Sequence, residues 1–103
     1  RPVVSQFVAD YQAAFNQPPS SFAGHAWDGL TIVYVALGRL PDGLSLEEQR
    51  TRLRDEIEAT EGLVGIDGVF NFTPEDHVGL SYQDMVLMRI TEGDWEYLPR
   101  EKW

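Results

Sequence analysis

Residues 21–40 read SFAGHAWDGLTIVYVALGRL and predict a long helix at the centre of the fold. Its apolar side chains recur at helical spacing and form one broad face, to which belong Phe22, Ala26, Trp27, Leu30, Val33, Tyr34 and Leu37. Ile32 and Val35 add apolar surface on the other side. A helix that is apolar on more than one side is buried from more than one direction. Ser21 is its expected N-cap.

Two further helices are predicted around this one. The first covers about residues 3–16, where apolar side chains recur every three or four positions, and it ends before Pro18-Pro19. The third covers about residues 45–60. It opens with the capping box of Ser45 and Glu48, and most of its surface is charged.

Beyond the third helix the apolar period becomes that of strands. Short strands are predicted over about residues 69–72, 84–91 and 95–98, with turns at 73–76 and 92–94. The predicted fold class is therefore α+β, with three helices followed by an antiparallel strand meander or hairpin.

Composition excludes several classes of partner. The chain has 103 residues, 43% of them apolar, which suits one small globular unit or part of one. Its net charge of −9 and scattered basic residues argue against nucleic acid and against anionic membranes. It has no cysteine, so disulfides, thiolate metal sites and a cysteine nucleophile are excluded. A start at Arg1-Pro2 without an apolar leader reads as a cut from a longer chain.

The two histidines are the residues that could carry chemistry. His25 lies one helical turn from Asp28, so their side chains could meet, with Ser20 or Ser21 as a nucleophile in a catalytic reading. A short Ser, His and Asp series is common by chance. A buried, hydrogen-bonded histidine or a ligand contact is the favoured interpretation.

His77 follows Glu75 and Asp76 in a turn, where a divalent metal is conceivable. Adjacent residues converge poorly on one ion, so we favour a turn in which Asp76 accepts backbone N–H bonds. The series Gly62, Gly65 and Gly68 lacks the Lys and Ser/Thr of a phosphate loop and reads as glycines at turns. No catalytic residue, metal site or cofactor is predicted.

Taken in order, several stretches resemble the type I periplasmic binding proteins, the leucine/isoleucine/valine-binding family. Residues 21–29 are similar to the family's "aYDA" helix, with Trp27 where Tyr is frequent and Gly29 where Ala is usual. The other similar stretches are Phe7-x-x-x-Tyr11 with Pro18-Pro19, Gly65-x-x-Gly68-x-Phe70-x-Phe72, Pro74-x-Asp76-His77-x-Gly79-Leu80, and Val86-x-x-x-x-Thr91-x-Gly93-x-Trp95. Together they span nearly the whole chain.

The resemblance implies the C-terminal segment of an extracytoplasmic protein with two α/β lobes. Such proteins capture a branched-chain amino acid, an amide or a small aromatic or organic acid by lobe closure, and deliver it to the membrane permease of an ABC transporter. Phe22 matches a position that commonly lines the ligand cleft, and His25 lies close enough to reach it.

Two alternatives remain. The chain could be a free-standing α+β interaction domain or a ligand-sensing domain. As an isolated segment, it is expected to expose apolar surface and to form a homodimer or a swapped dimer.

Overall fold

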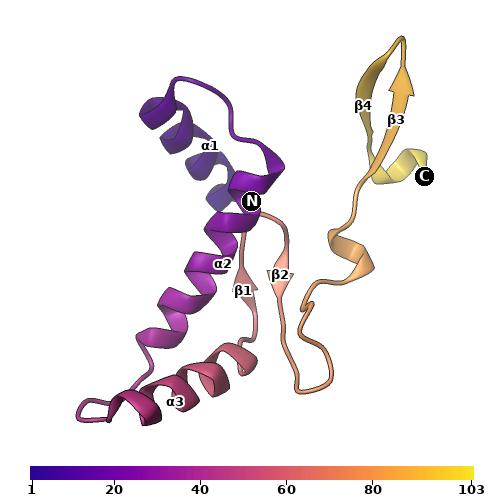
Figure 1. Ribbon diagram of the computed structural model, residues 1–103. Helices are drawn as coiled ribbons and strands as arrows, with labels where there is room; N and C mark the ends of the chain where they lie inside the picture. The colour runs from indigo at the N-terminus through magenta and orange to yellow at the C-terminus, as the bar shows by residue number, and fades with distance from the viewer.

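The computed structural model describes residues 1–103 and has three helices followed by two antiparallel hairpins (Figure 1). The helices are α1 (Pro2–Phe15), α2 (Ser21–Leu37) and α3 (Leu46–Glu58). The hairpins pair β1 (Leu63–Val64) with β2 (Val69–Phe70) and β3 (Leu87–Thr91) with β4 (Asp94–Leu98). Short 3-10 turns lie at η1 (Tyr82–Asp84) and η2 (Arg100–Lys102). The predicted fold class is confirmed.

α2 is the element around which the others are arranged. The Phe7 ring of α1 lies 5.4 Å from the Trp27 ring of α2, α3 contacts α2, and β1 lies beside it (Figure 1). The side of α2 that is buried within the chain is a narrow stripe of Gly24, Asp28, Ile32 and Ala36. The broad apolar face predicted from the sequence lies on another side and is largely exposed.

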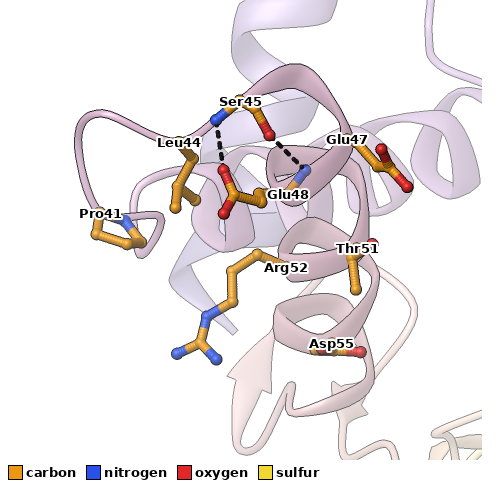
Figure 2. A pocket seen from close by; sticks show the side chains of 8 residues that line it. All are labelled: Pro41, Leu44, Ser45, Glu47, Glu48, Thr51, Arg52 and Asp55. Carbon is orange, nitrogen blue, oxygen red and sulfur yellow. Dashed lines mark hydrogen bonds between the residues drawn. The ribbon is translucent and has the colours of Figure 1, made fainter.

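α1 and α3 match their predicted ranges to within two residues, whereas both ends of α2 differ from the prediction. The N-cap of α2 is Ser20, in extended conformation and without a side-chain capping bond, rather than Ser21. α2 ends at Leu37 before Gly38, three residues earlier than predicted, and residues 38–40 leave it in a turn. At α3 the capping box is confirmed: Glu48 N–H donates to Ser45 Oγ (3.3 Å), and Ser45 N–H donates to Glu48 Oε2 (2.8 Å) (Figure 2).

β2 and β3 are shorter than predicted because neighbouring residues bond elsewhere, whereas β4 matches its prediction to within one residue and β1 was not predicted as a strand. Asn71 N–H donates to the Gly79 carbonyl and Phe72 N–H to the Thr60 carbonyl, so β2 ends at Phe70. The predicted strand at 84–91 is regular only from Leu87, since residues 82–84 form η1.

The β3–β4 hairpin lies apart from the rest of the chain (Figure 1). The molecule is accordingly elongated, with extents of 58 × 35 × 21 Å. Leu87 pairs with Leu98 and Thr91 with Asp94 at its two ends, and nearly every residue of the hairpin is exposed. None of the helices is long and apolar enough to span a membrane.

Candidate functional site

The loop of residues 65–68 is held against the first half of α2 by Asp28. This side chain is only 2% exposed. Its Oδ1 accepts the Ile66 N–H at 2.7 Å and its Oδ2 accepts the Asp67 N–H at 2.8 Å. Both carboxylate oxygens are therefore occupied by backbone donors, and a buried carboxylate bonded in this way is stabilised. By accepting the Asp67 N–H, Asp28 fixes the position of Asp67 relative to α2.

Two glycines allow this close approach. A Cβ at Gly24 of α2 would lie 3.0 Å from Ile66 Cγ2, and a Cβ at Gly65 would lie 2.7 Å from the Asp28 carboxylate. Gly24 therefore marks a close contact between α2 and the loop. Gly29, further along α2, has no atom within 4 Å of its Cβ position.

His25 is bonded to Asp67, not to Asp28. Its Nδ1 lies 2.5 Å from Asp67 Oδ2, while 56% of the His25 side chain is exposed. The burial expected for His25 is wrong, and the pairing with Asp28 that helical spacing allows does not form, because the Asp28 carboxylate points to the loop backbone. No hydrogen bond joins His25 to Ser20 or Ser21, so the geometry of an activated serine is not assembled here.

Arg1 also binds the backbone of this loop. Its guanidinium donates to the carbonyls of Ile66 (3.1 Å) and Asp67 (3.2 Å). Sequence reasoning missed both Arg1 and Asp67 as parts of this cluster. The available signal was an acidic residue in a glycine-flanked loop, but its partner lies 42 positions away.

Phe22 stands beside His25 at the start of α2. Its side chain is exposed, at 79%, and its ring meets the His25 ring edge-on with centroids 6.0 Å apart. The structure thus brings together the two residues predicted from the sequence to contact ligand. With Asp67 they form a small surface of one aromatic ring, one imidazole and one carboxylate, which we call the Phe22–His25–Asp67 cluster.

Asp84 supports the loop next to this cluster. Its Oδ1 accepts the Val69 N–H at 3.3 Å, and its Oδ2 accepts the Ser81 N–H at 3.0 Å. The backbone hydrogen bond from Ser81 holds the pKa of Asp84 below its ordinary value, against the opposing effect of partial burial, and the charge of Arg1 acts in the same direction as Ser81.

The second histidine lies in another part of the fold. His77 Nε2 is 2.9 Å from Glu58 Oε1 of α3, and Asp76 Oδ1 accepts the Val78 N–H at 2.8 Å. Asp76 therefore serves the turn, as predicted. No group of three or more histidine or acidic side chains converges in the structure.

The pocket at the start of α3 is lined mostly by polar side chains, two of which are bonded to each other. Figure 2 shows its lining residues, Pro41, Leu44, Ser45, Glu47, Glu48, Thr51, Arg52 and Asp55. Ser45 and Glu48 are engaged in the capping box, and Arg52 pairs with Glu56 and Asp55 with Arg54, so much of the polar lining serves α3 itself.

A large apolar surface is open to solvent on α2. We call this surface the outer face of α2. It consists of four residues that are each about half exposed or more: Trp27 (49%), Leu30 (71%), Tyr34 (78%) and Leu37 (48%). Scattered exposed apolar residues are ordinary, but a contiguous row marks a surface that another part or partner covers.

Comparison with known proteins gives one match. No protein-family model matches the sequence, and no curated protein matches it. Among solved structures, the chain is similar to a leucine-binding protein, LivK, from Thermotoga maritima, with a TM-score of 0.66 and 18% sequence identity. The match covers 96% of this chain and 26% of that protein, so the chain spans about a quarter of its neighbour's length. This confirms the predicted resemblance at the level of the fold.

Proposed function

We propose that these residues are the last part of an extracytoplasmic solute-binding protein that captures a small ligand between two lobes. The observation that carries the proposal is the fold match to a leucine-binding protein over 96% of this chain. The exposed outer face of α2 supports it, because such a face fits the interior of a larger lobe. Delivery of the ligand to an ABC transporter permease belongs to the same proposal.

In this proposal the protein binds its ligand and performs no chemistry on it. Closure is stabilised because the ligand contacts both lobes only in the closed form. Phe22 supplies apolar contact, and His25 supplies a polar contact beside it. Sites of this kind are mostly apolar, with a few polar groups that orient the ligand.

A thermal-shift screen of the full-length protein against amino acids, amides, urea and small aromatic acids tests the proposal. A ligand at about 100 times its Kd adds ~2.7 kcal/mol of stability, which gives a clear rise in Tm. Phe22→Ala should abolish the shift, whereas Phe15→Ala, which removes an exposed ring from the far end of α1, should leave it unchanged.

The 103-residue chain alone should bind none of these compounds tightly, because the second half of the cleft is missing. Saturable, tight binding to the isolated chain would contradict the two-lobe proposal. Absence of any shift across the panel with the full-length protein would favour the interaction-domain alternative, for which the exposed apolar surface is the supporting observation.

A further inference from the structure

We infer that His25, with its tautomer fixed by Asp67, selects a ligand whose group beside Phe22 ends in a hydrogen-bond donor such as a carboxamide, in preference to the purely apolar side chain of leucine. This inference rests on the proposed function and deepens it. The juxtaposition of these three side chains carries it.

The contact with Asp67 decides which ring nitrogen of His25 carries the proton. An ionised carboxylate can only accept hydrogen bonds. With Asp67 Oδ2 at 2.5 Å, Nδ1 must be the donor. In the neutral ring the other nitrogen, Nε2, is then an acceptor. Such a second hydrogen bond is what ordinarily fixes the tautomer of a functional histidine.

The surrounding charges also favour a donor over an anion. Asp28 of α2 accepts hydrogen bonds from the loop of residues 65–68, and Asp67 of that loop is bonded to His25 of α2. Asp84 accepts from the Val69 N–H, next to the same loop. Arg1 is the one basic side chain bonded there, and its guanidinium is directed to two backbone carbonyls. Three carboxylates against one guanidinium leave the neighbourhood acidic, which disfavours a ligand carboxylate at this point.

Phe22 supplies the apolar half of the same contact. Because its ring meets the His25 ring edge-on at 6.0 Å, a group of a few atoms can lie on Phe22 and still reach Nε2. Leucine would satisfy the ring and leave Nε2 without a partner. When lobe closure removes water from Nε2, an acceptor left without a partner costs about 1–3 kcal/mol, or about 5- to 150-fold in affinity.

Three amino acids of nearly the same shape test the inference by calorimetry on the full-length protein. Asparagine ends in an amide, leucine in two methyl groups and aspartate in a carboxylate. At about pH 8, where imidazole is ordinarily neutral, asparagine should bind at least ~5-fold more tightly than either of the others. His25→Phe should remove this preference, and His77→Phe, at the histidine paired with Glu58, should keep it.

Asp67→Ala separates tautomer control from a merely structural role. Without the carboxylate the ring can place its proton on Nε2, which then donates to an acceptor, so the advantage of asparagine over aspartate should shrink. Asparagine keeps its advantage over leucine, because its amide oxygen can accept. If Asp67 had only a structural role, the substitution would weaken the binding of all three ligands by similar factors.

Each remaining outcome has a defined meaning. Leucine binding as tightly as asparagine, or a preference that survives His25→Phe, would overturn the inference and leave the proposed function standing. Binding of another solute of the panel, with none of these three bound, would likewise overturn the inference and leave the proposed function standing. If no compound of the panel binds at all, the proposed function fails and the inference fails with it.

Discussion

Asp28 and Gly65 fit each other so closely that a Cβ at residue 65 would lie 2.7 Å from the Asp28 carboxyl carbon and from both of its oxygens. The carboxylate occupies the space that any side chain at this position would need. Its oxygens are in turn held by the two backbone N–H groups that follow Gly65. The place of the loop on α2 is therefore set by these two residues together.

Gly65→Ala is expected to destabilise the chain by about 1–3 kcal/mol, the usual cost of overpacking. The methyl group would force the Asp28 carboxylate off the loop. Urea unfolding followed by far-UV circular dichroism measures the change. Gly29→Ala is the control, because nothing lies within 4 Å of its Cβ position and alanine favours a helix by up to ~1 kcal/mol. Equal stabilities of the two variants would contradict the fit.

Asp28→Asn should lower the free energy of unfolding by about 1–3 kcal/mol. An asparagine has one acceptor oxygen, so it leaves either the Ile66 or the Asp67 N–H facing its own amide group. Asp42→Asn, in the exposed turn before α3, should change stability by no more than ~0.5 kcal/mol. Amide hydrogen exchange at residues 66 and 67 gives a local measurement, and unaltered protection there would argue against the proposed role of Asp28.

Ser45→Ala should cost about 0.5–2 kcal/mol through loss of the α3 cap. The Ser45 side chain and backbone N–H hold the pKa of Glu48 below its ordinary value of 4.5. Because the folded-state pKa is lowered, the contribution of Glu48 is present above its unfolded value and is lost as pH falls through the folded value. The difference between wild type and Ser45→Ala should accordingly shrink as pH falls below about 4.5. A difference that is constant with pH would show that Glu48 takes no part.

The isolated chain should self-associate through the outer face of α2. Leu30→Glu places a charge in the middle of this face and should shift the chain towards monomer in sedimentation velocity experiments. Val78→Glu, at an exposed residue of the 73–79 turn, is the matched control. Association that is insensitive to Leu30→Glu would point to the β3–β4 hairpin as the contact instead.

Local signals predicted the helices well, whereas contacts distant in sequence were not predictable. The capping box is read from residues 45 and 48 because its two partners are three positions apart. The bond of His25 to Asp67 joins positions on different elements, and only the docking of the loop on α2 creates it. Helical spacing suggested Asp28 as the partner of His25, but burial directs that carboxylate to two backbone donors.

The predicted burial of α2 shows the other limit of the sequence. Its apolar pattern indicates packing on several sides, and the chain itself covers only the stripe that contains Ile32 and Ala36. Trp27 and Tyr34 carry the same apolar signal and remain exposed. Periodicity reports that a face is suited to burial, and it does not report which polypeptide covers the face.

The separation of the β3–β4 hairpin has a consequence for the order of folding. Its pairs join residues close in sequence, from Thr91 with Asp94 to Leu87 with Leu98. The hairpin can therefore form within about 1–10 μs, before the helices have packed. The docking of residues 65–68 on α2 must instead close a chain of some forty residues, and the entropy of that closure slows it. The β3–β4 hairpin and the docked loop therefore form at independent rates. A mutation that slows the formation of one leaves the rate of the other unchanged.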